Sequence, residues 1–146
     1  MEKHGFLKEH SLTIASVVIL TTWIVAYVFS DPSKHLGSFF GNAIADWSGV
    51  LITVVATKYL YERGSAESKK PPHKYLKPLS RLLEEHSLTI FLIVSGLGWI
   101  WLFARMDAQS KWGQVVGNVV SEWTQILGLV VLTKRLIERG SKENRS

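Results

Sequence analysis

Hydrophobic residues gather in four long runs, separated by short polar segments. Residues 12–29 carry no charge, and neither do residues 88–104. Residues 39–57 and 115–133 each carry a single charge, Asp46 and Glu122. A bilayer core of about 30 Å is crossed by a helix of about 20 residues. The pattern therefore predicts four transmembrane helices, because a soluble four-helix bundle would show polar faces at helical spacing.

The second half of the chain repeats the first at a distance of 76 residues. The hexapeptide EHSLTI at residues 9–14 recurs at 85–90, and ERGS at 62–65 recurs at 138–141. Over residues 7–65, 25 of 59 positions are identical without a gap. A match of this length predicts a tandem duplication. We expect two helical hairpins, residues 1–65 and 81–146, joined by a basic linker at residues 66–80.

The ends of the helices also follow from the sequence. Prolines at positions 71, 72 and 78 favour a linker over a continuous helix. Residues 79–83 are expected to form a short amphipathic lead-in that lies on a surface. Ser11 and Ser87 are expected to cap the first helix of each hairpin. The second helices are expected to continue through Tyr61 and Ile137, ahead of Gly64 and Gly140.

The net charge of +5 reflects an uneven distribution of Lys and Arg. Fourteen of the 17 lie near the N-terminus, in residues 58–81 or in the tail from residue 134, and three lie in the other two loops. The positive-inside rule then places both termini and the linker in the cytoplasm. Anionic lipids are expected partners of Lys58–Arg81 and Lys134–Arg145. No nucleic-acid site is expected, because these basic residues lie against membrane ends.

These features predict an all-α membrane protein with four transmembrane helices, arranged as two tandem duplicated hairpins with cytoplasmic N and C termini. Its candidate chemistry lies on the second helix of each hairpin. Asn42 and Asp46 are four residues apart and share one helix face, and Asn118 and Glu122 repeat them. A carboxylate at mid-depth in a bilayer costs about 2.5–3.5 kcal/mol, so it should face protein or water.

Two interpretations of these polar residues stay open. In the first, they bind or conduct an ion or a proton, with any pore at the centre of a homo-oligomer. In the second, they form hydrogen bonds that hold the helices together, with the indole N–H of a neighbouring tryptophan as a donor, and the protein is structural or binds a partner. The candidate site comprises Asp46, Glu122, Asn42, Asn118, Gln125, Trp23, Trp99, Trp47 and Trp123.

Other chemistry has less support in the sequence. The chain has no cysteine, which excludes disulfides and thiolate sites. His10 and His86 occupy matched positions and could bind a haem or a metal, or could be interfacial side chains without a ligand. We expect no cofactor and no enzymatic activity, because the loops are short and no nucleophile–base pair, phosphate loop or run of metal ligands is present.

One part of the sequence resembles a known family. The matching residues are Ser121, Glu122, Trp123 and Gln125 in the second hairpin, with Gly64, Ser65, Glu67, Ser68 and Lys69 after the first. They resemble a family of small bacterial membrane proteins described only as a domain of unknown function. The first hairpin departs from the family pattern, because Gly49 stands where Gln125 stands in the second. The resemblance implies a multi-pass protein of the bacterial plasma (inner) membrane and implies no activity.

Overall fold

The computed structural model describes residues 5–69, 78–136 and 138–143. Within them the chain is helical, with no strand. The four long helices are α2 (Ser11–Val28), α3 (His35–Tyr59), α5 (Ser87–Arg105) and α6 (Lys111–Leu132), and the short helices α1 (Phe6–Glu9) and α4 (Pro78–Glu85) precede α2 and α5. All four long helices are long and apolar enough to cross a membrane. The prediction of an all-helical chain with four candidate spans is confirmed.

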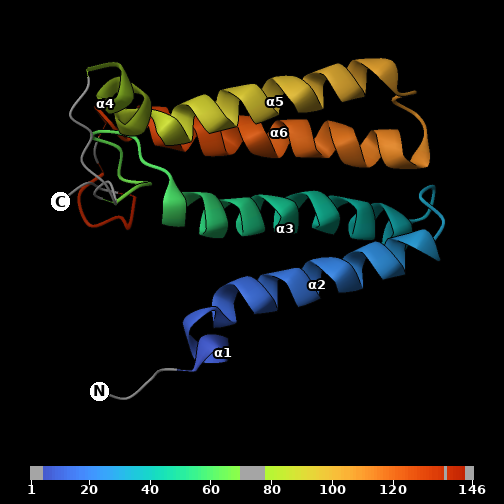
Figure 1. Cartoon of the computed structure of the whole chain (residues 1–146). Helices are drawn as coiled ribbons and strands as arrows, with labels where there is room; N and C mark the ends of the chain where they lie inside the picture. The colour runs from blue at the N-terminus through green and yellow to red at the C-terminus, as the bar shows by residue number, and fades with distance from the viewer. Residues whose placement is uncertain (1–4, 70–77, 137, 144–146) are drawn as a thin grey trace.

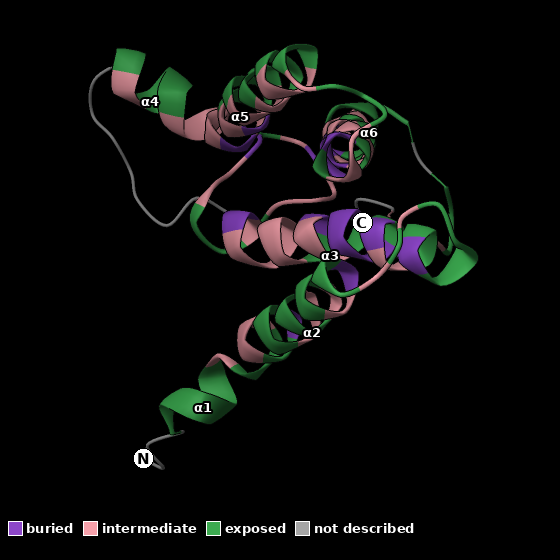
Figure 2. Ribbon diagram, turned by 90° about the vertical axis from the view of Figure 1, so that its right-hand side faces the viewer, coloured by how far each residue is buried: buried purple, intermediate pink, exposed green. Residues whose placement is uncertain are grey.

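The long helices lie side by side in the order α2, α3, α6, α5 (Figure 1). Seven residues of α3 and six of α6 are buried, against two each in α2 and α5, so the central pair forms most of the core. Figure 2 shows this burial concentrated on α3 and α6, with the outer helices largely exposed. Their exposed side chains are mainly apolar, as expected for helices in contact with a lipid bilayer.

The molecule has two distinct ends. The loops at residues 29–34 and 106–110 lie at one, which we call the loop end. At the loop end the Tyr27 hydroxyl donates to the Lys111 carbonyl, and Lys111 Nζ donates to the Ser30 carbonyl at 2.9 Å. Helices α1 and α4, and the segment that follows α3, lie at the opposite end, which we call the linker end (Figure 1). The Lys111 contacts tie the two hairpins together at the loop end.

The two hairpins match closely at the loop end. α5 begins 76 residues after α2, and α6 begins 76 residues after α3. A Cβ atom on Gly41 would lie 3.0 Å from the Tyr27 ring, and one on Gly117 would lie 2.9 Å from the Phe103 ring. Glycine at both positions therefore lets an aromatic ring of the preceding helix approach the backbone closely.

The linker end differs from the sequence prediction. α3 ends at Tyr59 and α6 at Leu132, so the prediction that these helices continue through Tyr61 and through residues 133–136 is wrong, and Ile137 lies outside the described residues. Tyr61 leaves the helix because its backbone bonds to the start of α5: its N–H donates to Ser87 Oγ at 2.9 Å, and its carbonyl accepts from Leu88 N at 3.0 Å.

Two smaller predictions about helix ends have different outcomes. The N-cap positions are His10 and His86, and neither makes a side-chain cap hydrogen bond, so the predicted serine caps are wrong. Ser11 Oγ instead donates to the Lys8 carbonyl at 3.0 Å. The short amphipathic lead-in is confirmed as α4, whose leucines at 79, 82 and 83 are exposed. Residues 70–77 of the predicted linker lie outside the described residues.

Candidate functional site

The predicted polar residues meet along the seam between α3 and α6. Asn118 Nδ2 donates to Asn42 Oδ1 at 2.5 Å. One helical turn further on, the carboxyl groups of Asp46 and Glu122 lie close enough to interact. Each of these contacts joins residues at equivalent positions of the two hairpins. α3 and α6 therefore run parallel and in register, related by a local twofold axis along the seam.

The two carboxyl groups lie near the middle of their helices. Asp46 and Glu122 each lie eleven residues after the start of their helix, which is about 17 Å at the helical rise. Asp46 is exposed at the surface of the chain, whereas Glu122 is half-buried. Two ionised carboxylates in contact repel each other strongly in a medium of low dielectric constant. Such a pair is suited to share a proton or to hold a cation between its oxygens.

Glu122 takes a path that only glycine on the neighbouring helix permits. A Cβ atom on Gly49 would collide with Glu122 Cγ and would lie 2.8 Å from its Oε1. The equivalent position on α6 is Gln125, which is long and polar. The seam is therefore symmetric at Asn42 and Asn118, and asymmetric one to two turns closer to the linker end.

A cavity of about 270 Å³ extends from the carboxyl pair toward the linker end. Glu122 and Gln125 line it near mid-span, and Thr53 and Thr57 line it on α3. Glu67, Lys142 and Glu143 line it at the linker end. The remaining lining is mainly apolar, so the cavity leads from Glu122 to charged residues outside the helices.

The four predicted tryptophans do not form one network with the carboxyl groups. Trp123 is buried, donates from Nε1 to Ser95 Oγ at 2.8 Å and packs edge-on against Trp99, with ring centroids 5.7 Å apart. Trp23 stacks on Phe40, and its Nε1 is buried without a hydrogen-bond partner among the described residues. Trp47 is half-buried on α3.

A second polar cluster lies at the linker end and was not predicted from the sequence. Glu62 is only 1% exposed. Its Oε1 accepts from Lys134 Nζ at 2.8 Å and from His86 Nδ1 at 2.6 Å. Burial alone would raise the pKa of Glu62, but interactions with the side chains of Lys134, Thr89 and His86 more than offset it, so the pKa of Glu62 lies below its ordinary value.

The residues around Glu62 hold one hairpin against the other. We call Glu62–Ser65 the first ERGS turn and Glu138–Ser141 the second ERGS turn. Arg63 N donates to the Glu85 carbonyl at 2.7 Å, and the two side chains form an ion pair at 3.5 Å. Ser65 Oγ lies 3.1 Å from Thr133 Oγ1, in a buried contact. The first ERGS turn is thus seated between the start of α5 and the end of α6.

The signal for this cluster was present in the sequence. Its residues come from the stretches that the two hairpins share most fully: EHSLTI supplies His86, the Thr-Lys pair supplies Lys134, and ERGS supplies Glu62. His10, the equivalent of His86, lies elsewhere, with Nδ1 3.2 Å from Lys58 Nζ. The structure does not bring the two histidines together, and the part of the chain it describes contains no group of three residues suited to a metal.

Comparison with known proteins found no matching family model, no matching curated protein and no matching solved structure. The resemblance to small bacterial membrane proteins stays a prediction.

Proposed function

We propose that this chain is a small multi-pass membrane protein that binds a proton or a small cation at Asp46 and Glu122 and passes it along the α3–α6 seam. The observation that carries this proposal is the proximity of two carboxyl groups at mid-span, with a cavity leading from Glu122 toward the linker end. Gln125, Thr53 and Thr57 line that cavity and offer oxygen atoms to a moving ion.

The chemistry follows from the surroundings of the pair. An ionised carboxylate inside a membrane needs a partner, and here each carboxyl group has a second carboxyl group within reach. One bound proton would allow the two groups to share a hydrogen bond, and one bound monovalent cation would balance part of their charge. Either species would be exchanged through the cavity, because its far wall carries the charged side chains of Glu67, Lys142 and Glu143.

The remaining parts of the proposal rest on sequence features and general principles. We infer that the linker end faces the cytoplasm, because it carries most Lys and Arg residues. Those residues would attract anionic lipids. We also infer that the hairpins arose by duplication, that the membrane is a bacterial plasma membrane, and that a second copy covers Asp46 and Asn42, whose exposure to lipid would be unfavourable.

A second candidate function is structural, and one observation favours it. The hydrogen bond between Asn118 and Asn42 is short and joins the two hairpins without help from any ion. In that case the carboxyl pair, carrying one proton, would add to the same network and hold α3 against α6. The protein would then serve as a scaffold or bind a partner, with nothing transported.

Flux measurements on reconstituted protein separate the two candidates. Wild-type protein in liposomes should carry protons or a monovalent cation, and the Asp46→Asn/Glu122→Gln variant should lose this flux while keeping its helix content and its size in detergent. The matched control is Asp31→Asn/Asp107→Asn, which removes two acids at equivalent positions at the loop end. The control should keep the wild-type flux.

The structural candidate predicts a different outcome. Wild-type liposomes would show no flux above protein-free liposomes for any ion tested. The Asp46→Asn/Glu122→Gln variant would unfold or change its oligomeric size, while the control would not. That result would overturn the transport proposal and assign the carboxyl pair to helix packing.

A further inference from the structure

The residues that contact the first ERGS turn at the linker end have equivalents in the first hairpin, and no ERGS turn contacts these equivalents among the described residues. The filled place, where the first ERGS turn lies, is between the start of α5 and the end of α6 and holds the turn through His86, Thr133 and Lys134. The equivalent residues of the other hairpin are His10, Thr57 and Lys58, with identical side chains. They line an open groove of about 730 Å³ between α2, α3 and the segment that follows the first ERGS turn. That segment contributes Glu67, and Glu9 is a second acid on the wall of the groove.

The second ERGS turn already has the conformation of the first. Gly64 and Gly140 have positive φ angles of 83° and 88°, a conformation that favours glycine. Ser65 N donates to the Glu62 carbonyl at 3.2 Å, and Ser141 N donates to the Glu138 carbonyl at 3.1 Å. The main difference is in their surroundings, because Glu62 is 1% exposed and Glu138 is exposed.

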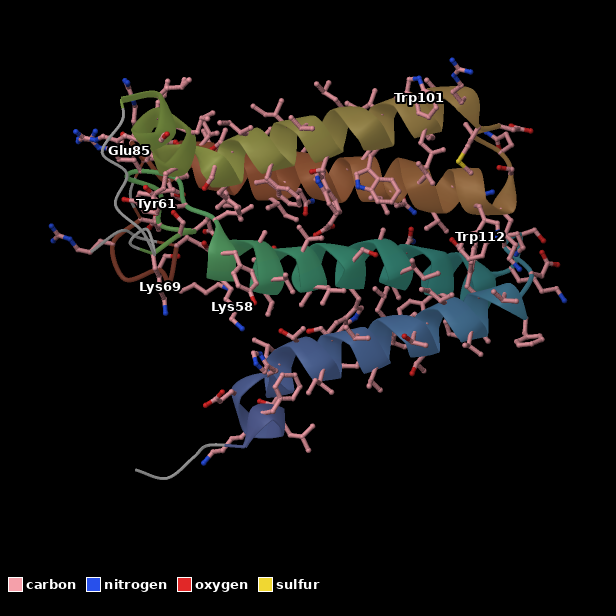
Figure 3. The ribbon with its side chains drawn as sticks, in the orientation of Figure 1. Lys58, Tyr61, Lys69, Glu85, Trp101 and Trp112 are labelled. Carbon is pink, nitrogen blue, oxygen red and sulfur yellow. The ribbon has the colours of Figure 1, made fainter. Side chains whose placement is uncertain are left out.

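The basic side chains of the open groove are also in place. Lys58 Nζ lies 3.2 Å from His10 Nδ1, so the groups equivalent to the two donors to Glu62 already lie together. In Figure 3, Lys58 points from α3 toward α2, away from the side where Tyr61 and Glu85 lie. A carboxylate entering this groove would meet two nitrogen donors, as Glu62 does in the filled place.

Local symmetry indicates which turn fits the open groove. The contacts of Asn42 with Asn118 and of Asp46 with Glu122 define a twofold axis between the hairpins. This axis relates the filled contact to a contact of the second ERGS turn with His10 and Lys58 of the same chain. The chain from the helix-end lysine to the ERGS turn has the same length in both hairpins, because Glu62 is four positions after Lys58 and Glu138 is four positions after Lys134.

The hairpins differ at the end where the turn is missing. In the second hairpin, Trp99 on α5 packs against Trp123 on α6. In the first, Trp23 on α2 packs against Phe39 and Phe40, closer to the loop end, rather than against Trp47. Figure 1 shows α2 and α3 diverging toward the linker end. The second hairpin, on which the first ERGS turn is seated, is closed at the linker end. The first hairpin, on which no turn is seated, is open there.

We propose that the groove of His10, Thr57 and Lys58 binds the second ERGS turn of the same chain. The Glu138 carboxylate takes the place between Lys58 and His10 that Glu62 takes between Lys134 and His86, and Ser141 lies against Thr57. Docking closes α2 onto α3 and makes the linker end symmetric. This docking uses neither member of the carboxyl pair, but Thr57 lines both the groove and the cavity, so docking is tested by disulfide formation and not by flux.

Engineered disulfides test the docking directly, because the chain has no cysteine of its own. The pair Thr57→Cys/Ser141→Cys should close a disulfide within one chain when the full-length protein is oxidised in a membrane. The positive control is Ser65→Cys/Thr133→Cys, whose hydroxyl oxygens lie 3.1 Å apart. The negative control is Thr57→Cys/Ser65→Cys, which places both thiols in the first hairpin and should stay reduced.

The readout is the loss of free thiols together with the mobility of the chain on a non-reducing gel. Because Lys142 and Glu143 already line a cavity with Thr57, loss of both thiols at monomer mobility for Thr57→Cys/Ser141→Cys supports the proposal only together with a lower yield in the Glu138→Gln background. Reducible dimers would overturn it in favour of docking into a second copy. Retained thiols would overturn the proposal if the positive control closes. If the positive control also stays reduced, the contact between Ser65 and Thr133 on which the proposal is based is absent, and the proposal is overturned as well.

A charge variant then tests the role proposed for Glu138. In the Thr57→Cys/Ser141→Cys background, Glu138→Gln should lower the disulfide yield several-fold, because the carboxylate no longer draws the turn between Lys58 and His10. Glu143→Gln, a second acid of the same tail, should leave the yield unchanged. Equal yields for the two variants would overturn the assignment of Glu138.

Discussion

Lys134 provides the most direct test of how the two hairpins are held together. Its ammonium group is one of two nitrogen donors to Glu62 Oε1, and the Glu62 side chain is only 2% exposed. Lys134→Ala removes this donor and leaves the Glu62 carboxylate buried with His86 as its remaining ionisable partner. We expect the free energy of unfolding to fall, because a buried charge that loses a partner keeps its full desolvation penalty.

The magnitude follows from the exposure of the groups. Breaking a fully buried ion pair costs about 3–5 kcal/mol. The Lys134 side chain is 33% exposed, so water can replace part of the lost interaction, and we expect a loss of about 1–3 kcal/mol. The control is Lys142→Ala, whose side chain is 90% exposed and pairs with Glu143 at 3.5 Å. We expect the control to change stability by less than about 0.5 kcal/mol.

The assay is unfolding of the purified protein in mixed micelles by a denaturing detergent, followed by tryptophan fluorescence. Both variants are compared with the wild type in the same titration, so that differences in free energy do not depend on a long extrapolation. A loss for Lys134→Ala that is no larger than the loss for Lys142→Ala would refute the reasoning. It would mean that the Glu62 cluster does not hold the hairpins together.

Two further predictions concern pH and helix packing. The pKa of Glu62 lies below its ordinary value of 4.5. The stabilising effect of Glu62 is therefore present above about that pH and is lost as the pH falls through the folded-state pKa. The difference in free energy of unfolding between wild type and Glu62→Gln should shrink in acid and stay constant near neutral pH. Gly49→Ala should destabilise the protein by about 1–3 kcal/mol in the same unfolding assay, because its methyl group would collide with Glu122. Gly98→Ala, which would meet nothing within 4 Å, should be neutral or stabilising, and equal effects of the two changes would contradict the packing described for Gly49.

The four spans could be predicted because length and hydropathy are local properties of a sequence. Uncharged runs such as residues 12–29 need no knowledge of the rest of the chain to be identified as membrane helices. The pairing of Asn42 with Asn118 was also within reach, because the repeat places both residues at one depth. Identical spacing in two parallel helices brings equivalent residues to the same level.

The linker end could not be predicted in the same way. Whether Tyr61 continues a helix depends on Ser87 and Leu88, which lie more than 25 residues away in the chain and compete for its backbone groups. The predicted cap at Ser87 failed for a related reason, since Ser87 is engaged by Tyr61, whereas Ser11 donates to the Lys8 carbonyl of its own hairpin. Local sequence propensity predicts where an isolated helix ends. The end of α3 and the start of α5 are instead determined by contacts between the two hairpins, which local propensity does not include.

The Glu62 cluster shows what the repeat could have revealed. Its charged residues lie in stretches that are identical in the two hairpins although they fall outside the apolar runs. Hydrophobic helices tolerate exchange of one apolar residue for another, so most positions within the spans differ. Among the charged residues that match outside the spans, Glu62 and Lys134 contact each other across the two hairpins.

The asymmetry at Gly49 has a consequence for how the chain assembles. Two hairpins that are nearly alike could pair with themselves in different molecules as readily as with each other in one. Two α6 helices would bring Glu122 against Gln125, where both side chains are long, and two α3 helices would leave Gly49 facing an unfilled space. Only α3 with α6 matches a long side chain to a gap, so the seam disfavours pairing of two α3 helices or of two α6 helices from different molecules.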